Sequence, residues 1–177
     1  MKTTAILIAG FGGQGTLFAG KVLASASLEK GLEVSWLPSY GPEMRGGTAN
    51  CSVMISESPI GSPIVSHPDI LIALNKPSFE KYEKAAASGA KIFVDSSLVD
   101  SRSSRTDIEA YYIPASELAR KAGDGKLSNI VLVGKVLKET GIFSIEEIEA
   151  CLDGMIPEKR AALRELNKKA LKAGYGE

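Results

Sequence analysis

The sequence predicts a single α/β domain over residues 1–177, with a mostly parallel β-sheet and a helical C-terminal third. Short apolar runs alternate with segments whose apolar residues recur at helical spacing, as they do in folds built from strand–helix–strand units. The chain has 177 residues, of which 44% are hydrophobic, and this suits one domain with a substantial core. No internal repeat and no dividing linker is visible in the sequence.

The first third of the chain predicts one strand–helix–strand unit. Residues 4–9 form a continuous apolar run, which is typical of a strand buried on both faces. After a glycine-rich segment, residues 16–30 show helical spacing, and Gly31 stands where a helix C-cap is expected. Residues 33–37 are interpreted as the second strand, which Pro38 ends.

The middle of the chain continues the alternation after a loop over residues 39–47. The expected strands are 48–56, 69–74, 91–94 and 110–113, and the expected helices are 78–87 and 115–122. Ligands of parallel sheets bind at the carboxyl ends of the strands. We therefore expect four segments to meet at one edge of the sheet: Gly10 to Gly15, Ser39 to Gly47, Asn75 with Lys76, and Asp95 to Ser97.

The last third is expected to be helical. Residues 129–140 are apolar on most sides and predict a buried helix, with a strand as the alternative. Ser144 and Glu147 have the spacing of a capping box. Pro157 suits the first turn of the last helix, where its missing N–H costs nothing. One face of that helix carries three apolar residues: Leu163, Leu166 and Ala170.

The composition argues against several classes of function. Lysine plus arginine and aspartate plus glutamate both number 21, so the formal net charge is zero and gives no support for binding nucleic acid or a membrane surface. Aromatic residues make up 6%, which disfavours a base-stacking platform. No signal-peptide cleavage pattern and no apolar run of membrane-spanning length is present, so we expect a cytoplasmic protein.

The residues that most often carry catalysis are sparse. Cys51 and Cys151 lie far apart and form no CxxC pair, so we expect two reduced, buried thiols and no metal or cluster site made by this chain alone. His67, the sole histidine, precedes Pro68 in a segment rich in helix breakers. It is interpreted as a loop residue and not as a general base. We expect no catalytic residue in this chain.

A glycine-rich loop follows the first expected strand and precedes the first expected helix. Its six residues are Gly10, Phe11, Gly12, Gly13, Gln14 and Gly15, and they fit the pattern G-x-G-x-x-G. A helix start behind such a loop can bind an anion. A dinucleotide site also needs an acidic residue at the end of the second strand, whereas residues 36–39 contain none and Glu33 stands at the strand's start. A phosphate, a partner protein and a purely structural packing role all remain open.

A second motif, from Ser39 to Gly47, has the sequence SYGPEMRGG. The guanidinium of Arg45 can bind a carboxylate or a phosphate through two parallel hydrogen bonds. Glu43 can orient Arg45 or reach a different chain, and Tyr40 and Met44 add apolar surface that favours a protein interface. The alternative is a surface loop with a local ion pair.

Together the two motifs, the second extended to Thr48 and Ala49, resemble those of the gamma subunit of 2-oxoacid:ferredoxin oxidoreductases, and most of all that of the 2-oxoglutarate enzyme. The resemblance runs from about Thr3 to Leu171 and implies a Rossmann-like, three-layer domain docked against other subunits. The complete enzyme decarboxylates a 2-oxo acid oxidatively, transfers the acyl group to coenzyme A and passes electrons to ferredoxin.

The resemblance also implies how cofactors and partners are distributed. Thiamine diphosphate, Mg²⁺ and iron–sulfur clusters are expected in the partner subunits (alpha, beta and delta), and none is expected on this chain alone. Coenzyme A is a co-substrate, and ferredoxin is reached through the complex. The residues expected at an anion or coenzyme A edge are Gly10, Gly12, Gly13, Gln14, Gly15 and Arg45, and those expected to contact a partner are Tyr40, Glu43, Met44 and Arg45.

Two alternative functions stay open. The first is the corresponding subunit of an indolepyruvate or branched-chain 2-oxo acid enzyme, to which the chain is also similar. A free-standing NAD(P)-binding domain is the alternative from another class. When purified alone, the chain is expected to form a homodimer, because an unoccupied apolar docking surface favours self-association.

Overall fold

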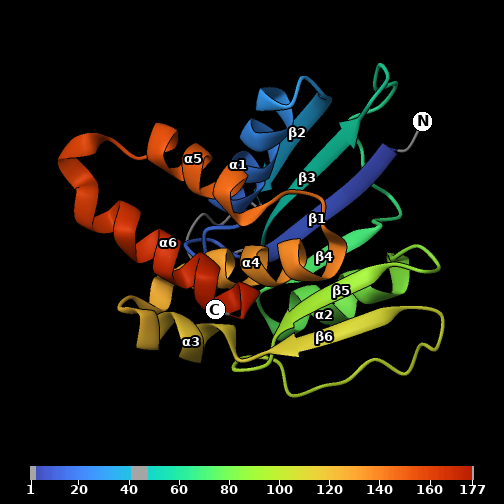
Figure 1. Ribbon diagram of the computed structural model, residues 1–177. Helices are drawn as coiled ribbons and strands as arrows, with labels where there is room; N and C mark the ends of the chain where they lie inside the picture. Colours follow the sequence, from blue (N-terminus) through green and yellow to red (C-terminus); the bar gives the residue numbers. More distant parts are fainter. Residues whose placement is uncertain (1–2, 41–47, 177) are drawn as a thin grey trace.

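The computed structural model describes residues 3–40 and 48–176, and these residues form one six-stranded sheet with helices on both faces (Figure 1). The strands lie in the order β2-β3-β1-β4-β5-β6. Their bounds are β1 Thr3–Phe11, β2 Glu33–Tyr40, β3 Thr48–Ser56, β4 Ile70–Ala73, β5 Lys91–Asp95 and β6 Glu109–Ile113. The expected strands are all present, but Pro38 does not end β2, which continues to Tyr40. Because β2 is an edge strand, a proline without an N–H is tolerated there.

The sheet is mostly parallel, as predicted, with one strand reversed. Strands β4, β5 and β6 extend the sheet from β1 in parallel, whereas β3 is antiparallel to both β1 and β2. Strands β1 and β2 are therefore not neighbours, which corrects the simple strand–helix–strand unit expected at the N-terminus. Only residues 41–47 join β2 to β3, and a parallel crossover needs about a dozen residues or more, so β3 must return antiparallel.

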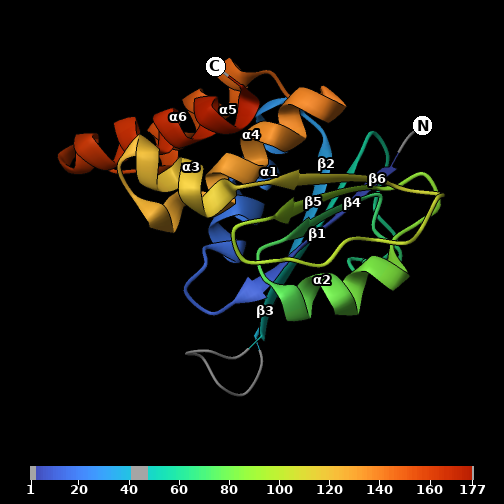
Figure 2. The same cartoon turned by 90° about the horizontal axis from the view of Figure 1, so that it is seen from below.

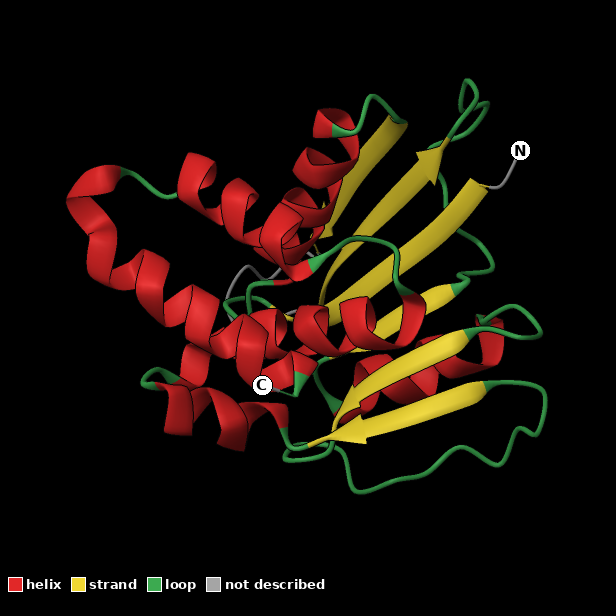
Figure 3. Cartoon of the chain, viewed as in Figure 1, coloured by secondary structure: helices red, strands yellow, loops and turns green. Residues whose placement is uncertain are grey.

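The helices form layers on either side of the sheet. Their bounds are α1 Thr16–Glu29, α2 Lys76–Tyr82, α3 Ala115–Ala122, α4 Ser128–Thr140, α5 Ile145–Met155 and α6 Ala161–Tyr175. Figure 2 shows α2 alone on one face and the other helices on the opposite face. Helices α1 and α4 contact the strands, and α3, α5 and α6 pack against those two helices. After β6 the chain is helical to its end, as predicted (Figure 3).

Apolar side chains of β1 and β4 alternate between two cores. Ile6 and Ile8 belong to the large core under α1 and α4, whereas Leu7 and Leu71 belong to the smaller core under α2, which centres on Phe79. A strand with apolar side chains on both faces has no polar positions, which is why its sequence is a continuous apolar run. The buried central strands thus follow directly from the sequence pattern.

Two of the predicted helix boundaries are confirmed and one is wrong. The Ser144 hydroxyl accepts a hydrogen bond from the Glu147 N–H at 3.2 Å, and the Glu147 carboxylate accepts one from the Ser144 N–H at 2.8 Å, which completes the capping box of α5. Gly31 follows α1 with a φ of 71°. Pro157 lies outside α6: its ψ of 145° is extended, and a 3-10 helix, Glu158–Arg160, separates it from Ala161.

Helices α4 and α6 approach each other until their backbones touch. A Cβ atom on Gly134 would collide with the carbonyl oxygen of Leu171, and one on Gly174 would collide with that of Val131. Both glycines are therefore required by packing, because only a residue without a Cβ permits this approach. The contact holds α6 against α4 and so fixes the outer layer of the helical third.

Gly174→Ala tests this backbone contact, and Gly154→Ala is its matched control. A Cβ at Gly174 has no room, so we expect the variant to lose on the order of 1–3 kcal/mol or more of unfolding free energy. Gly154 lies in α5 with no atom within 4 Å of an added Cβ, and alanine there is expected to stabilise the helix by roughly 0.5–1 kcal/mol. Urea denaturation of the three proteins measures both changes. Equal stability of the two variants would contradict the packing argument.

Candidate functional site

The glycine loop forms a tight turn between β1 and α1. The Gln14 N–H donates to the Phe11 carbonyl at 3.1 Å, which closes the turn. Gly13 and Gly15 have φ values of 96° and 75°, in the region that side chains other than glycine rarely adopt. Two of the four glycines are therefore explained by backbone conformation.

The side chain of Gln14 fastens the loop to the end of β4. Its Oε1 accepts hydrogen bonds from the Phe11 N–H at 2.6 Å and from the Asn75 Nδ2 at 3.0 Å, and its Nε2 donates to the Leu74 carbonyl at 3.0 Å. A Cβ on Gly10 would lie 2.8 Å from Gln14 Oε1, so Gly10 leaves room for this side chain. Because the side-chain amide of Gln14 already forms hydrogen bonds within the fold, the loop can offer a ligand mainly its backbone N–H and C=O groups.

Asn129 of α4 fastens the loop from the other side. Its Nδ2 donates to the Gly15 carbonyl at 3.0 Å, and a Cβ on Gly15 would collide with this amide group. Gly15 has no side chain to cap α1, and the first turn of α1 contains no acidic residue. The positive end of a 14-residue helix therefore faces the loop without a neutralising side chain, which favours an anion there.

The other segments expected at this edge are partly placed by the structure. Asp95 is fully buried, and its carboxylate accepts hydrogen bonds from the Ser97 N–H at 3.0 Å and from the N–H and hydroxyl of Ser116 at 3.2 and 2.5 Å. This acid therefore holds the start of α3. Tyr40 pairs with Ala49 and Phe11 with Thr48, so the loop from β2 to β3 leaves and re-enters the sheet at the edge where the glycine loop lies.

The residues assigned to partner contact lie almost entirely outside the described part of the chain. Glu43, Met44 and Arg45 belong to residues 41–47, and only the backbone of Tyr40 is described. Their roles, and that of Arg45 in anion binding, stay predictions. The loop's anchors at the ends of β2 and β3 agree with a position beside the glycine loop.

A cavity of about 340 Å³ opens next to the glycine loop on its helical side. Gly15 and Phe18, at the start of α1, form one wall. The other walls come from α4, the end of α5, α6 and the 3-10 turns before α4 and α6, and they include Lys126, Asn129, Arg160 and Asn167. The sequence interpretation did not single out these four residues. A signal was present, because Asn129 and Asn167 interrupt helix faces that are otherwise apolar, and both are buried.

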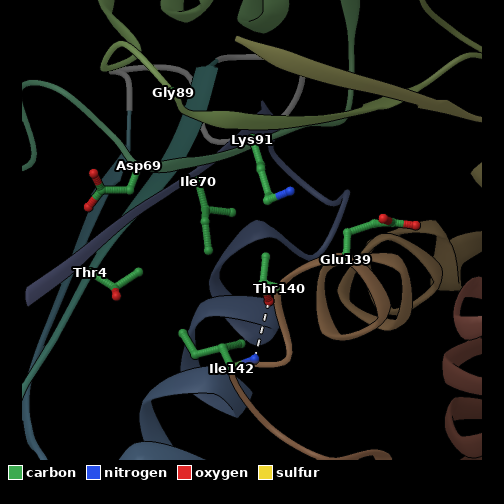
Figure 4. A pocket seen from close by; sticks show the side chains of 8 residues that line it. All are labelled: Thr4, Asp69, Ile70, Gly89, Lys91, Glu139, Thr140 and Ile142. Atoms are coloured by element: carbon green, nitrogen blue, oxygen red, sulfur yellow. Dashed lines mark hydrogen bonds between the residues drawn. The ribbon is translucent and has the colours of Figure 1, made fainter. Parts of the chain in front are cut away.

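A second cavity, of about 400 Å³, lies at the opposite edge of the sheet (Figure 4). Its charged groups already have partners: Lys91 Nζ contacts Glu109 at 2.6 Å, and Glu139 contacts Lys135 at 2.5 Å. The hydrogen bond to Glu109 raises the pKa of Lys91, and the one from Lys135 lowers the pKa of Glu139, so both pairs stay charged at neutral pH. Because these groups are engaged, this cavity carries less binding capacity than the one beside the glycine loop.

Both cysteines and the histidine are placed as expected. Cys51 in β3 and Cys151 in α5 are buried, and this burial raises the pKa of each thiol to about 12. A thiol with such a pKa is protonated at neutral pH and is a poor nucleophile. His67 is exposed in a loop, with its Nδ1 3.1 Å from the Ala85 carbonyl oxygen.

The described residues offer neither a metal-binding cluster nor a helix that could cross a membrane. Within residues 3–40 and 48–176, no three or more histidine, cysteine, aspartate or glutamate residues are grouped so that they could hold a metal ion. In the same part of the chain, no helix has both the length and the apolar character that crossing a membrane requires.

Known proteins resemble this chain in sequence and in fold. The family model for pyruvate ferredoxin/flavodoxin oxidoreductase matches residues 5–177. Ketoisovalerate oxidoreductase subunit VorA of Methanothermobacter thermautotrophicus is 43% identical over 142 residues, which are 80% of this chain and 29% of VorA. The chain thus spans less than a third of that relative. The 2-oxoglutarate synthase subunit KorC of Methanocaldococcus jannaschii is 35% identical over 175 residues, 96% of this chain and 91% of KorC.

A solved structure gives the same result. The gamma subunit of a keto/oxoacid ferredoxin oxidoreductase from Geobacter sulfurreducens superposes with a TM-score of 0.86 at 30% identity, and the match covers 99% of this chain and 95% of that subunit. The resemblance noted from the two loop motifs is therefore confirmed over nearly the whole chain.

The buried thiols give a direct chemical test of the fold. At pH 8, a pKa of about 12 leaves almost no thiolate, and neither sulfur is accessible, so the folded protein is expected to react with Ellman's reagent far more slowly than a free thiol. In denaturing urea both thiols regain ordinary pKa values, and two equivalents should react at once. Rapid reaction of one thiol in the folded protein would show that it is accessible and ionised.

Proposed function

Because this chain belongs to the pyruvate ferredoxin/flavodoxin oxidoreductase family and has the gamma-subunit fold, we propose that it is the gamma subunit of a multi-subunit 2-oxoglutarate:ferredoxin oxidoreductase. That enzyme decarboxylates 2-oxoglutarate oxidatively, forms the acyl-coenzyme A product and passes electrons to ferredoxin. The observation that carries the proposal is the match to a 2-oxoglutarate synthase subunit, which spans almost the full length of both chains.

A branched-chain 2-oxo acid enzyme is the second candidate. It is favoured by the higher identity, 43%, to a ketoisovalerate oxidoreductase subunit, although this chain covers only 29% of that protein. The two candidates share the same gamma fold and differ in the substrate pocket, which we assign to the partner subunits. The substrate preference of the assembled enzyme must therefore be measured to choose between the two candidates.

In the proposed complex this chain contributes no catalytic residue. Its two cysteines lie on separate elements, β3 and α5, and are buried, so they do not offer the thiolate set that holds an iron–sulfur cluster. We assign thiamine diphosphate, Mg²⁺ and the clusters to the alpha, beta and delta subunits. The chain then acts in the cytoplasm, meets ferredoxin through the complex, and forms a homodimer when separated from its partners.

We assign two neighbouring roles to the edge where the glycine loop lies. The proposed anion or coenzyme A edge consists of Gly10, Gly12, Gly13, Gln14, Gly15 and Arg45, and the uncapped start of α1 supports it. The proposed partner contacts are Tyr40, Glu43, Met44 and Arg45. Strand β2 supports this second role, because it is an edge strand with Trp36 38% exposed and Leu37 41% exposed, and it leads directly into residues 41–47.

Isolation of the native complex tests the proposed function. Pull-down of this chain, tagged at one end, is expected to recover the other subunits and an activity that reduces ferredoxin with 2-oxoglutarate and coenzyme A. The chain alone should show no such activity, because we assign thiamine diphosphate and the clusters to the other subunits. A panel of 2-oxo acids on the same preparation separates 2-oxoglutarate from branched-chain substrates. Robust turnover by the chain alone would refute the subunit role.

Arg45→Ala in the complex tests the role of the second loop. We expect either a loss of assembly or a rise of about tenfold in the KM for coenzyme A, because one charge-assisted hydrogen bond contributes roughly 1.5–3 kcal/mol. Lys84→Ala is the matched control, since it removes an exposed positive charge after α2, and it should change neither property. If assembly and KM are both unchanged in Arg45→Ala, the loop has neither role.

A further inference from the structure

The cavity beside the glycine loop has an apolar lining that is continuous with the large core. Phe18, Met155 and Leu163 line it, and all three are half-buried and pack against that core. Leu127 and Ile156 also line it and are buried. Covering such a lining removes apolar surface from water, which is favourable in proportion to the area covered. The cavity is therefore suited to apolar groups.

The two asparagines in the lining do not supply the polar anchors of the cavity. The Nδ2 atoms of Asn129 and Asn167 donate to the carbonyls of Gly15 and Leu163 at 3.0 and 2.8 Å. Their Oδ1 atoms have almost no accessible surface, so a group inside the cavity does not reach them. Polar contacts with an occupant therefore depend on the charged residues of the lining.

Those charged residues are two cations. Lys126 and Arg160 line the cavity, are exposed, and form no ion pair among residues 3–40 and 48–176. No aspartate or glutamate belongs to the lining. The chain as a whole has equal numbers of acidic and basic side chains, so this local excess of positive charge is not a property of the whole surface. Charge complementarity favours an occupant that carries carboxylates.

The composition and position of the cavity suit a protein segment. An apolar centre with an aromatic residue and a methionine, and an arginine beside it, is typical of protein interfaces. Gly15 belongs both to the lining and to the glycine loop, at whose edge we place partner contacts. The junction of α5 and α6, which carries Arg160, lies at the far left of Figure 1, away from the sheet. A partner can therefore approach the cavity from outside the domain.

The relatives supply a reason to expect such a neighbour. This chain covers 29% of VorA, so the matching region of VorA is joined to further protein in one polypeptide. A domain of this fold is thus found attached to other protein. An apolar surface on a subunit of a larger assembly is normally covered by a neighbouring subunit.

We propose that this cavity receives an acidic, amphipathic segment of a partner subunit. Apolar side chains of that segment pack against Phe18, Met155 and Leu163, and its carboxylates lie toward Lys126 and Arg160. The proposal rests on the proposed function, because it requires a multi-subunit complex. It adds a docking surface on the helical side of the glycine loop to the partner contacts at the sheet edge.

Displacement of the fluorescent probe anilinonaphthalene sulfonate tests the cavity. The probe combines aromatic rings with a sulfonate, so it imitates an apolar side chain beside a carboxylate. We expect it to bind the isolated full chain saturably, to bind Arg160→Glu about tenfold more weakly, and to be released when the remaining subunits are added. Lys159→Glu is the matched control, because it reverses the charge of an exposed neighbour outside the lining and should leave the affinity unchanged.

Assembly of the complex gives the second measurement. Arg160→Glu and Lys126→Glu should each weaken binding of this chain to the remaining subunits about tenfold, and the loss should shrink at high salt, because salt screens exposed charges. Lys159→Glu should assemble like the unchanged chain. Biolayer interferometry measures the affinities. Thermal melting checks that each variant is folded, which is expected because all three change exposed side chains.

Three results would overturn the proposal: a complex that binds the probe as tightly as the free chain does, an Arg160→Glu variant with unchanged affinity for the probe, or unchanged assembly in both Arg160→Glu and Lys126→Glu. Release of the probe when this chain self-associates without other subunits would assign the cavity to a second copy and would also overturn it.

These failures differ from a failure of the proposed function. An active 2-oxoglutarate complex in which the cavity stays open to the probe refutes the docking segment alone. A chain that joins no other subunit refutes the subunit role, and the docking proposal falls with it.

Discussion

The contact between the backbones of α4 and α6 positions the outer helices and the cavity between them. Gly134 and Gly174 allow two helices to approach closely, and neither position has room for a Cβ. Asn129 lies on α4 and Asn167 on α6, so this approach brings their side chains to one cavity. The relative position of these two side chains is thus set by the glycines that let the helices approach, and α4 in turn packs against the sheet.

Side-chain amides fix the glycine loop in place. Gln14 joins the loop to the end of β4, and Asn129 joins it to the start of α4. Amides suit this task because each offers both donors and an acceptor and carries no charge. The helix start of α1 is therefore held rigidly, with its positive end unneutralised, between the sheet edge and the cavity. The anion site that we propose there would require no ordering of these residues when a ligand binds, which would support affinity.

How far the sequence could predict the fold depended on the range of each interaction. Residues 4–9 predicted a doubly buried strand because its apolar pattern is local, and Ser144 with Glu147 predicted the start of α5 because a capping box spans four residues. The reversal of β3 was not predicted, although the short loop over residues 41–47 implied it by length. Asn129 and Asn167 were missed because each looks like an ordinary polar residue until the packing of distant helices buries its oxygen, which has no hydrogen-bond partner among the described residues.

By itself, the sequence determined the order of strands and helices, the glycine turn before α1, and, through its two loop motifs, the family. Those properties depend on side-chain periodicity, on backbone conformations that only glycine adopts readily, and on contacts between residues that are close in sequence. All three can be recognised from the order of residues. Tertiary structure alone decided the sheet order, the close pairing of α4 with α6, and the cavity next to the glycine loop. Each of these depends on residues separated by tens of positions, and their proximity arises only when helices from different parts of the chain pack on one sheet.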